Sequence, residues 1–172
     1  SIIKLIPERE YLAGIPEVIK YGLIDNKTIL NFLRNNKKSI VNRNFNRVSK
    51  MCKLALLSKI KFFSKDVHEK NQRLKLNFGH TFAHAIEMTL EKYFKKDYIR
   101  HGEAVGIGIL CELYYSNPKR NKILKFTKNL LEMYNLPTKL SSKKIKSNIQ
   151  AIQSIIYKNI FLDKKKISQF PR

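Results

Sequence analysis

Glycine, proline, acidic side chains and long apolar runs are all scarce in this sequence of 172 residues, which has 6 glycines and 5 prolines. Alternation of polar and apolar residues is also rare, and this argues against a sheet-rich fold. No apolar run approaches the roughly 18 to 20 residues that a membrane span needs. Residues 1–9 lack the apolar core of a signal peptide. These absences favour a helical protein with no membrane segment.

Cysteine is nearly absent too, with only Cys52 and Cys111. Their spacing fits neither a CxxC metal motif nor a disulfide framework. We therefore expect reduced thiols and a cytoplasmic protein. The sequence begins at Ser1 rather than Met, which we interpret as the sign of a fragment, a processed product or a trimmed chain.

Acidic residues are far outnumbered by basic ones, since 13 Asp and Glu face 35 Lys and Arg and the net charge is +22. Such a charge is typical of proteins that bind nucleic acid. Lysine, isoleucine and asparagine are abundant together, however, and all three have AT-rich codons, so mutational bias would give the same composition. Both interpretations stay open, with compositional bias favoured. An anionic substrate would account for a few of the charges.

Helical periodicity dominates the chain and predicts helices over residues 8–24, 26–36, 40–63, 71–93, 101–116, 119–135 and 141–158. Pro16 is expected to bend the first of them. The polar tail, residues 164–172, is expected to fray. Because no internal repeat or linker is visible, we predict one all-α domain spanning residues 1–172.

The chain has no dinucleotide-binding fingerprint. Its G-x-G is Gly106-Ile107-Gly108, with Cys111 where the third glycine would stand, and no strand is predicted before it. These small residues are better explained by close approach of two helices. We therefore predict no Rossmann-type NAD site and name no cofactor-binding residue in this chain.

Metal-competent side chains are concentrated in residues 76–87. His80, His84 and Glu87 stand at i, i+4 and i+7, so they share one face of a helix. His101 opens a later predicted helix. Two histidines and one glutamate would suit a catalytic zinc ion with an open position for water or substrate.

The first predicted helix adds Glu17 and Lys20, an acid and a base about one turn apart. Spacing alone does not decide which side chains bind the metal. One option is the helical pair of His80 and His84, and the other is the set of Glu17, His80 and His101.

Several separate segments, in order along the chain, together resemble 3-dehydroquinate synthase, an enzyme of the shikimate pathway of aromatic amino acid biosynthesis. The resemblance rests on residues 5–10, Ala13 to Gly22, the spacing of Lys59, Asp66, Glu69 and Arg73 before Leu76-Asn77-Phe78-Gly79-His80-Thr81, His101-Gly102-Glu103-Ala104-Val105, and Leu162-Asp163-Lys164-Lys165.

This resemblance implies a role for each matching residue. The zinc ligands would be Glu17, His80 and His101, and cobalt or iron would suit the same ligands. The substrate-contacting and active-site residues would be Lys20, Lys59, Glu69, Arg73, Asn77, His84 and either Lys164 or Lys165. His84 would then not bind the metal.

The resemblance also implies a fold and a reaction. The chain would be the multi-helix C-terminal domain of the dehydroquinate synthase-like superfamily, without the N-terminal α/β nucleotide-binding domain. The enzyme, a lyase and homodimer, converts 3-deoxy-D-arabino-heptulosonate 7-phosphate to 3-dehydroquinate and phosphate. It uses a zinc-bound substrate hydroxyl and transient oxidation by NAD, which the absent domain would mainly hold. The isolated chain is then expected to be inactive.

Four alternatives to this interpretation stay open: a related sugar-phosphate cyclase, a metal-dependent polyol dehydrogenase, a basic helical protein that binds nucleic acid, and a remnant that folds without catalysing. Of the possible partners, an anionic sugar phosphate and an NAD-binding half are expected, nucleic acid is disfavoured, and no membrane is expected.

Overall fold

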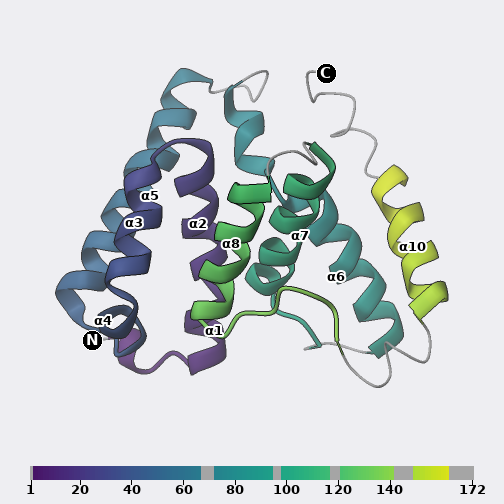
Figure 1. The fold of residues 1–172 in the computed structure, drawn as a ribbon, viewed down its shortest axis with the longest axis horizontal. Coiled ribbons are helices and arrows are strands. Elements are labelled where there is room, and N and C mark those ends of the chain that lie inside the picture. The colour runs from purple at the N-terminus through teal and green to yellow at the C-terminus, as the bar shows by residue number, and fades with distance from the viewer. Residues whose placement is uncertain (1, 67–71, 95–97, 117–120, 142–148, 163–172) are drawn as a thin grey trace.

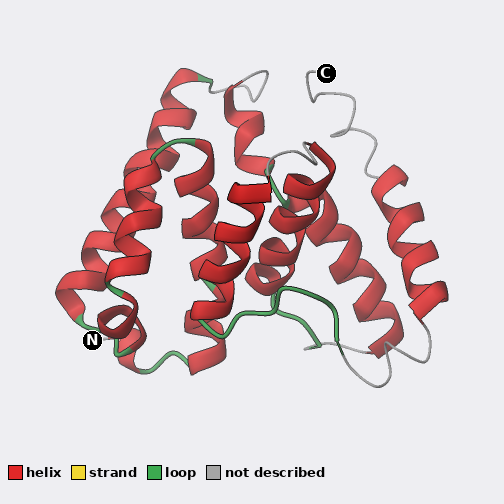
Figure 2. Ribbon diagram, viewed as in Figure 1, coloured by secondary structure: helices red, strands yellow, loops and turns green. Residues whose placement is uncertain are grey.

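The computed structural model describes residues 2–66, 72–94, 98–116, 121–141 and 149–162, and within these ranges every regular element is a helix (Figures 1 and 2). The predicted all-α fold is confirmed. In chain order the elements are η1 (Ile2–Lys4), α1 (Glu8–Ala13), α2 (Ile15–Ile24), α3 (Lys27–Asn35), α4 (Lys37–Val41), α5 (Phe45–Lys65), η2 (Gln72–Asn77), α6 (His80–Phe94), α7 (His101–Ser116), α8 (Asn121–Met133) and α10 (Ile149–Leu162).

Helix α7 lies at the centre of the molecule. Residues 102–110 are all buried, as expected of a helix that is apolar on every side. It packs against α6, α2 and α8, while α10 lies on the far side of α6 (Figure 1). Helices α3 and α5 pack against α2. The site residues on α2, α6 and α7 are therefore carried by elements at the core.

The core consists of two apolar clusters on either side of this central helix. The first gathers side chains from α2, α3, α5 and α8, and it includes Ile19, Leu33 and Tyr134. The Tyr134 hydroxyl is fully buried and donates a hydrogen bond of 2.8 Å to the Leu33 carbonyl oxygen. The second cluster joins α6, α7 and α10 through Leu90, Ile109 and Ile152. Together the two clusters fix α2 and α6 against α7.

Side chains and short breaks define several helix ends. Asn26 caps α3 by accepting a hydrogen bond of 3.0 Å from the Thr28 backbone N–H, and Asn44 caps α5 in the same way. The predicted bend at Pro16 in the first helix is found as a break at Gly14, two residues before Pro16.

The helix predicted over 71–93 is wrong at its start. Residues 72–77 form the 3-10 helix η2, and α6 begins only at His80. Gly79 separates them with a φ of +85°, a left-handed conformation that breaks a continuing helix. His80 consequently stands at the first turn of its own helix, and the predicted interior position is corrected.

Two other predicted helices also have bounds that differ from those in the structure. The helix predicted over 40–63 is found as α5, with the short helix α4 before it. The helix predicted over 141–158 is represented by α10, while residues 142–148 and the predicted tail 164–172 lie outside the described residues. Among the helices that the structure describes, none is long and apolar enough to cross a membrane.

Candidate metal centre

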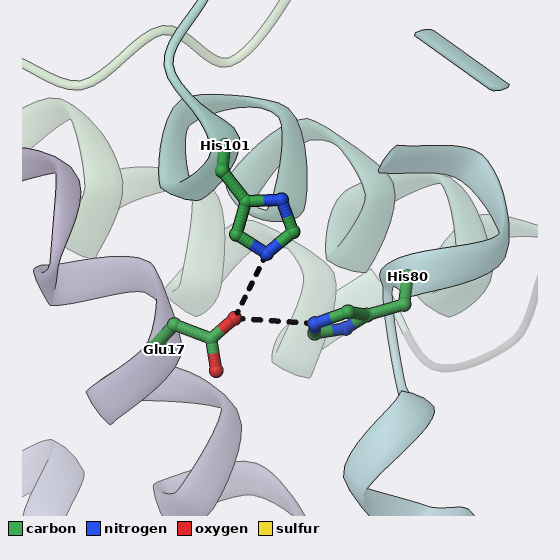
Figure 3. A group of neighbouring side chains, drawn as sticks. All are labelled: Glu17, His80 and His101. Carbon is green, nitrogen blue, oxygen red and sulfur yellow. Dashed lines mark ion pairs between the residues drawn. The ribbon is translucent and has the colours of Figure 1, made fainter. Parts of the chain in front are cut away.

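Three helices each bring one metal-competent side chain to a common point. Glu17 comes from α2, His80 is the first residue of α6, and His101 is the first residue of α7 (Figure 3). The Glu17 Oε1 atom lies 3.3 Å from His80 Nε2 and 3.7 Å from His101 Nε2. One ligand atom from each residue lies within 4.8 Å of the others, and no further group of this kind exists among the described residues.

Glycines allow these helices to approach closely enough for the three side chains to meet. A Cβ atom on Gly102 would lie 1.6 Å from the Ala13 carbonyl oxygen, so the start of α7 rests directly on the end of α1. A Cβ atom on Gly108 would lie 2.0 Å from the Gly79 carbonyl oxygen. The predicted close approach at the G-x-G is thus confirmed. The first contact places His101 near α2, and the second fixes the turn that presents His80.

The Glu103 carboxylate stabilises the first turn of α7 through hydrogen bonds. Glu103 accepts a hydrogen bond of 2.9 Å from the Arg100 backbone N–H, which is the glutamate half of a capping box. Both of its oxygens also accept from Arg9 of α1, at 2.7 Å each. Burial opposes ionisation of Glu103, but the Arg9 and Arg100 donors outweigh it and lower the pKa of this carboxyl. His101 therefore sits on a turn held by charge-assisted bonds.

Glu17 is ionised at neutral pH despite its partial burial. Burial works to raise the pKa of Glu17, but the hydrogen bond from His80 and the charge of Lys20 outweigh it and lower that pKa to about 2. Lys20 Nζ lies 2.6 Å from Glu17 Oε2, so one oxygen faces the lysine and the other faces the two histidines. The predicted acid and base pair on this helix is in contact.

The two histidine rings are each held through their second nitrogen. His80 Nδ1 lies 3.3 Å from the Phe78 carbonyl oxygen. His101 Nδ1 lies 3.1 Å from both oxygens of Glu87. The hydrogen bond to Glu87 is the main cause that raises the pKa of His101. In both rings Nε2 is the nitrogen directed at Glu17.

The donor set and its spacing fit zinc. Two ligand atoms bound at about 2.1 Å to one tetrahedral ion lie about 3.4 Å apart, and the two Nε2-to-Oε1 separations are 3.3 and 3.7 Å. Imidazole nitrogen and carboxylate oxygen are both common zinc ligands. Each histidine also has an acceptor behind it, as metal-binding histidines usually do.

His84 lies beside the two histidines but outside the group of three. Its ring centroid is 5.6 Å from that of His80 and 6.1 Å from that of His101. Among the described residues, the group whose ligand atoms converge consists of Glu17, His80 and His101 and does not include His84. Asn77, at the end of η2, is half-buried two residues before Gly79.

The predicted anion-binding residues come from three elements. Lys20 of α2 is 3% exposed. Burial lowers its pKa even though Glu17 favours the charged form, and the charge of Lys59 adds to the lowering. The Lys59 ammonium lies 5.9 Å from the ring centre of Phe63, and the Arg73 guanidinium lies 4.0 Å from it. Phe63 thus links the cations of α5 and η2.

Three predicted residues cannot be placed. Glu69 and both candidate lysines, Lys164 and Lys165, lie outside the described residues.

Glu112, by contrast, was not singled out from the sequence. Burial is the main influence on it and raises its pKa to about 7, against the opposing effects of the Gly79 N–H and Lys20. The available signal was an acid at the end of the otherwise apolar stretch 104–113.

Comparison with known proteins identifies the relatives of this chain. The family model described as 3-dehydroquinate synthase C-terminal matches residues 14–166. The 3-dehydroquinate synthase of Thermodesulfovibrio yellowstonii is 36% identical over 173 residues, which cover 96% of this chain and 44% of that protein. That of Dictyoglomus thermophilum is 45% identical over 114 residues, or 65% of this chain and 30% of that protein. The chain thus spans less than half the length of these relatives.

A solved structure shows the same fold. The 2-epi-5-epi-valiolone synthase ValA of Streptomyces hygroscopicus subsp. jinggangensis, with NAD+ and Zn2+ bound, superposes with a TM-score of 0.74. The match covers 96% of this chain and 44% of that chain, at 16% sequence identity. At this identity the likeness concerns the fold alone.

Proposed function

The chain belongs to the 3-dehydroquinate synthase C-terminal family, and from this premise we propose that it provides the metal- and substrate-binding half of a 3-dehydroquinate synthase. The proposed reaction eliminates phosphate from 3-deoxy-D-arabino-heptulosonate 7-phosphate and closes the carbocycle of 3-dehydroquinate. The observation that carries the proposal is the convergence of His80 Nε2 and His101 Nε2 on one oxygen of Glu17 from three separate helices.

We propose that Glu17, His80 and His101 hold a zinc ion. ValA contains Zn2+, and the two histidines and the carboxylate of this chain are suitable ligands for the same ion. Cobalt or iron would suit the same donors. When bound, zinc acts as a Lewis acid that polarises a coordinated substrate oxygen. The protein contributes the fixed ring orientations and the ionised carboxylate.

Lys20, Lys59 and Arg73 are proposed to bind the anionic groups of the substrate. The burial of Lys20 and the neighbouring charge of Lys59 both disfavour the protonated state of Lys20. A bound phosphate or carboxylate would offset this by stabilising the charged ammonium. Arginine can bind such groups through two parallel hydrogen bonds. Lys59 of α5 and Arg73 of η2 both lie close to the ring of Phe63.

His84 and Asn77 are proposed to act on the substrate rather than on the metal. The His84 ring centroid lies 5.6 Å from that of His80 and 6.1 Å from that of His101, near enough to hydrogen-bond a molecule held there. A neutral imidazole in that place can carry a proton to or from a reacting oxygen. Glu69 and Lys164 or Lys165 are proposed for the same site on the resemblance of their motifs alone.

NAD and its binding residues are proposed to come from the other half of the full-length enzyme. ValA binds NAD+, and the curated relatives are more than twice as long as this chain. No Rossmann glycine motif is present in the sequence of 172 residues. A homodimer of the complete enzyme is part of the same proposal.

The family membership favours dehydroquinate synthase over the alternative functions. Relatives that are 36 to 45% identical carry that name, whereas the 2-epi-5-epi-valiolone synthase ValA is 16% identical over the matched residues. A nucleic-acid-binding protein would explain the charge of +22, but it would not require Glu17, His80 and His101 to converge.

The proposal is tested by the zinc content of the purified chain after exhaustive dialysis against metal-free buffer. One zinc per chain is expected for the wild type, and His80→Ala, His101→Ala and Glu17→Ala should each lose it, because three ligands hold the ion. His84→Ala is the matched control, since it removes a neighbouring imidazole that is outside the ligand group, and it should keep one zinc. A His84 variant that loses zinc as fully as the His80 variant would show that the ligand set is wrong.

A further inference from the structure

Glu87 connects the two helices that carry the histidines. It lies on α6, two turns after His80, and its carboxylate faces the ring of His101 at the start of α7. Both carboxylate oxygens lie 3.1 Å from His101 Nδ1. Because Glu87 does not belong to the group of three ligand residues, its contact with the site runs through His101.

This contact decides which nitrogen of His101 carries the proton. An ionised carboxylate only accepts hydrogen bonds, so Nδ1 is the protonated nitrogen when Glu87 binds the neutral ring. The Nε2 lone pair is then free on the side of Glu17, whose Oε1 lies 3.7 Å away. A histidine can bind a metal only through an unprotonated nitrogen.

His101 depends on such support more than His80 does. The His80 side chain is 15% exposed and its Nδ1 faces the carbonyl oxygen of Phe78, two residues earlier in the same turn. The His101 side chain is 49% exposed, and solvent on one side of the ring offers other orientations and the other tautomer. A charged acceptor on a different helix restricts both.

We propose that Glu87 is a positioning residue, which holds His101 with Nδ1 protonated and Nε2 directed at the metal. The proposal rests on the metal site proposed above. Partners of this kind typically change metal affinity by 10- to 100-fold when they are removed. Glu87 would therefore tune the metal affinity of the site without contacting the metal or the substrate.

The test compares Glu87→Ala and Glu87→Gln with Glu91→Gln, in which an exposed carboxyl one turn further along α6 loses the same charge. Zinc dissociation constants are measured by competition with a chromophoric chelator at pH 8. Glu87→Ala should weaken binding about 10- to 100-fold. Glu87→Gln, which keeps an acceptor oxygen, should weaken it less, and Glu91→Gln should match the wild type.

A second readout needs no metal. In zinc-free protein labelled with 15N, the ring nitrogen shifts should show His101 protonated at Nδ1 in the wild type and in Glu91→Gln. In Glu87→Ala the proton should move partly to Nε2. Circular dichroism checks that each variant is folded, and Glu87→Gln serves if Glu87→Ala is not.

Either of two results overturns the role of Glu87: a zinc affinity in Glu87→Ala within threefold of the wild type, or an unchanged His101 tautomer. If the wild type itself binds no zinc, the proposed metal site fails, and the tautomer measurement alone then decides whether Glu87 positions the ring.

Discussion

Glu112 combines burial with a charge that the fold does not fully compensate. Its carboxyl group accepts a hydrogen bond from the Gly79 N–H and lies near Lys20, but its Oε1 atom has no hydrogen-bond partner among the described residues. A carboxylate costs more to bury in this state than a neutral carboxylic acid does. Burial accordingly raises the pKa of Glu112 to about 7.

Because of this raised pKa, Glu112→Gln is expected to increase the stability of the fold in a pH-dependent way. Since the folded protein holds a proton that the unfolded chain releases above its ordinary pKa of 4.5, stability falls as the pH rises from about 4.5 through 7. Glutamine stays neutral, so the variant should be more stable than the wild type by about 1 to 3 kcal/mol at pH 8 and equal to it at pH 4. Urea unfolding of the metal-free protein at both pH values measures the difference.

The exposed Glu91→Gln provides the control for this experiment, because it removes a carboxyl of α6 that is open to solvent, and it should change stability little at either pH. A Glu112→Gln variant that is less stable than the wild type at pH 8 would mean that the fold stabilises the Glu112 carboxylate, for example through Lys20, and does not disfavour it.

Single residues were predictable from the sequence where a motif marked them. The set of Glu17, His80 and His101 could be preferred as metal ligands only through the family resemblance, because the spacing alone left the helical pair of His80 and His84 as another option. The structure turns Glu87 toward His101 Nδ1, a contact between two helices that no spacing within one helix can reveal. Glu112 was missed because its role arises from burial.

At the scale of elements, the crossing of α7 over the junction of α1 and α2 decides where His101 lies. The Gly102 Cα approaches the Ala13 backbone so closely that a Cβ atom would stand 1.6 Å from the carbonyl oxygen and 2.7 Å from the carbonyl carbon. Neither atom belongs to a flexible side chain, so one helix would have to move as a unit. Glu103 and Arg9 tie the same two elements together beside it.

Gly102→Ala is therefore expected to separate α7 from α1. The variant should lose about 3 kcal/mol or more of its free energy of unfolding, and its zinc affinity should fall because His101 moves away from Glu17. Urea unfolding and chelator competition measure the two effects.

Gly14→Ala is the matched control for this substitution. Gly14 lies at the same junction with an ordinary helical φ of −74°, and its nearest Cβ contact would be 3.4 Å from the Tyr11 carbonyl oxygen. That variant should change stability by less than about 1 kcal/mol, since alanine suits this backbone conformation. Equal losses in Gly102→Ala and Gly14→Ala would show that the junction is not the critical contact.

Helices were predicted well, and their buried faces less well. The range 101–116 matches α7 in full, since small and apolar residues fill it without a breaker. In α5, of the residues whose spacing predicted the helix, Val48 is buried, whereas Leu56 and Ile60 are more than half exposed. Apolar periodicity identified the helix, but which side faces the core depends on how α2 and α3 pack against it.

At the scale of the whole molecule, acidic residues are few. The chain has 13 acidic residues against 35 basic ones and a net charge of +22, although Glu17, Glu87 and Glu112 lie at or near the candidate site. A positive field of this kind attracts anionic substrates. The same field would also attract nucleic acid, so net charge alone does not separate these functions.

The 172 residues alone are not expected to convert the substrate. The proposed metal site and its neighbouring cations lie in this chain, while the relatives are more than twice as long, so the hydride acceptor is expected to be held by the other half. The purified chain, given zinc, NAD+ and 3-deoxy-D-arabino-heptulosonate 7-phosphate, should release no inorganic phosphate above a protein-free blank. The full-length synthase of Dictyoglomus thermophilum should release phosphate in the same assay.

Phosphate release from the chain alone would contradict the expectation that the other half holds the hydride acceptor, but only if the release depends on the proposed metal site. His80→Ala, which removes a proposed ligand, distinguishes the two cases: release that disappears in this variant would mean that the helical domain can bind NAD productively by itself, while release that persists would come from a contaminating phosphatase. A chain that releases no phosphate but retains one zinc would be the expected metal-binding half, because ligation by Glu17, His80 and His101 requires only the helices of this chain.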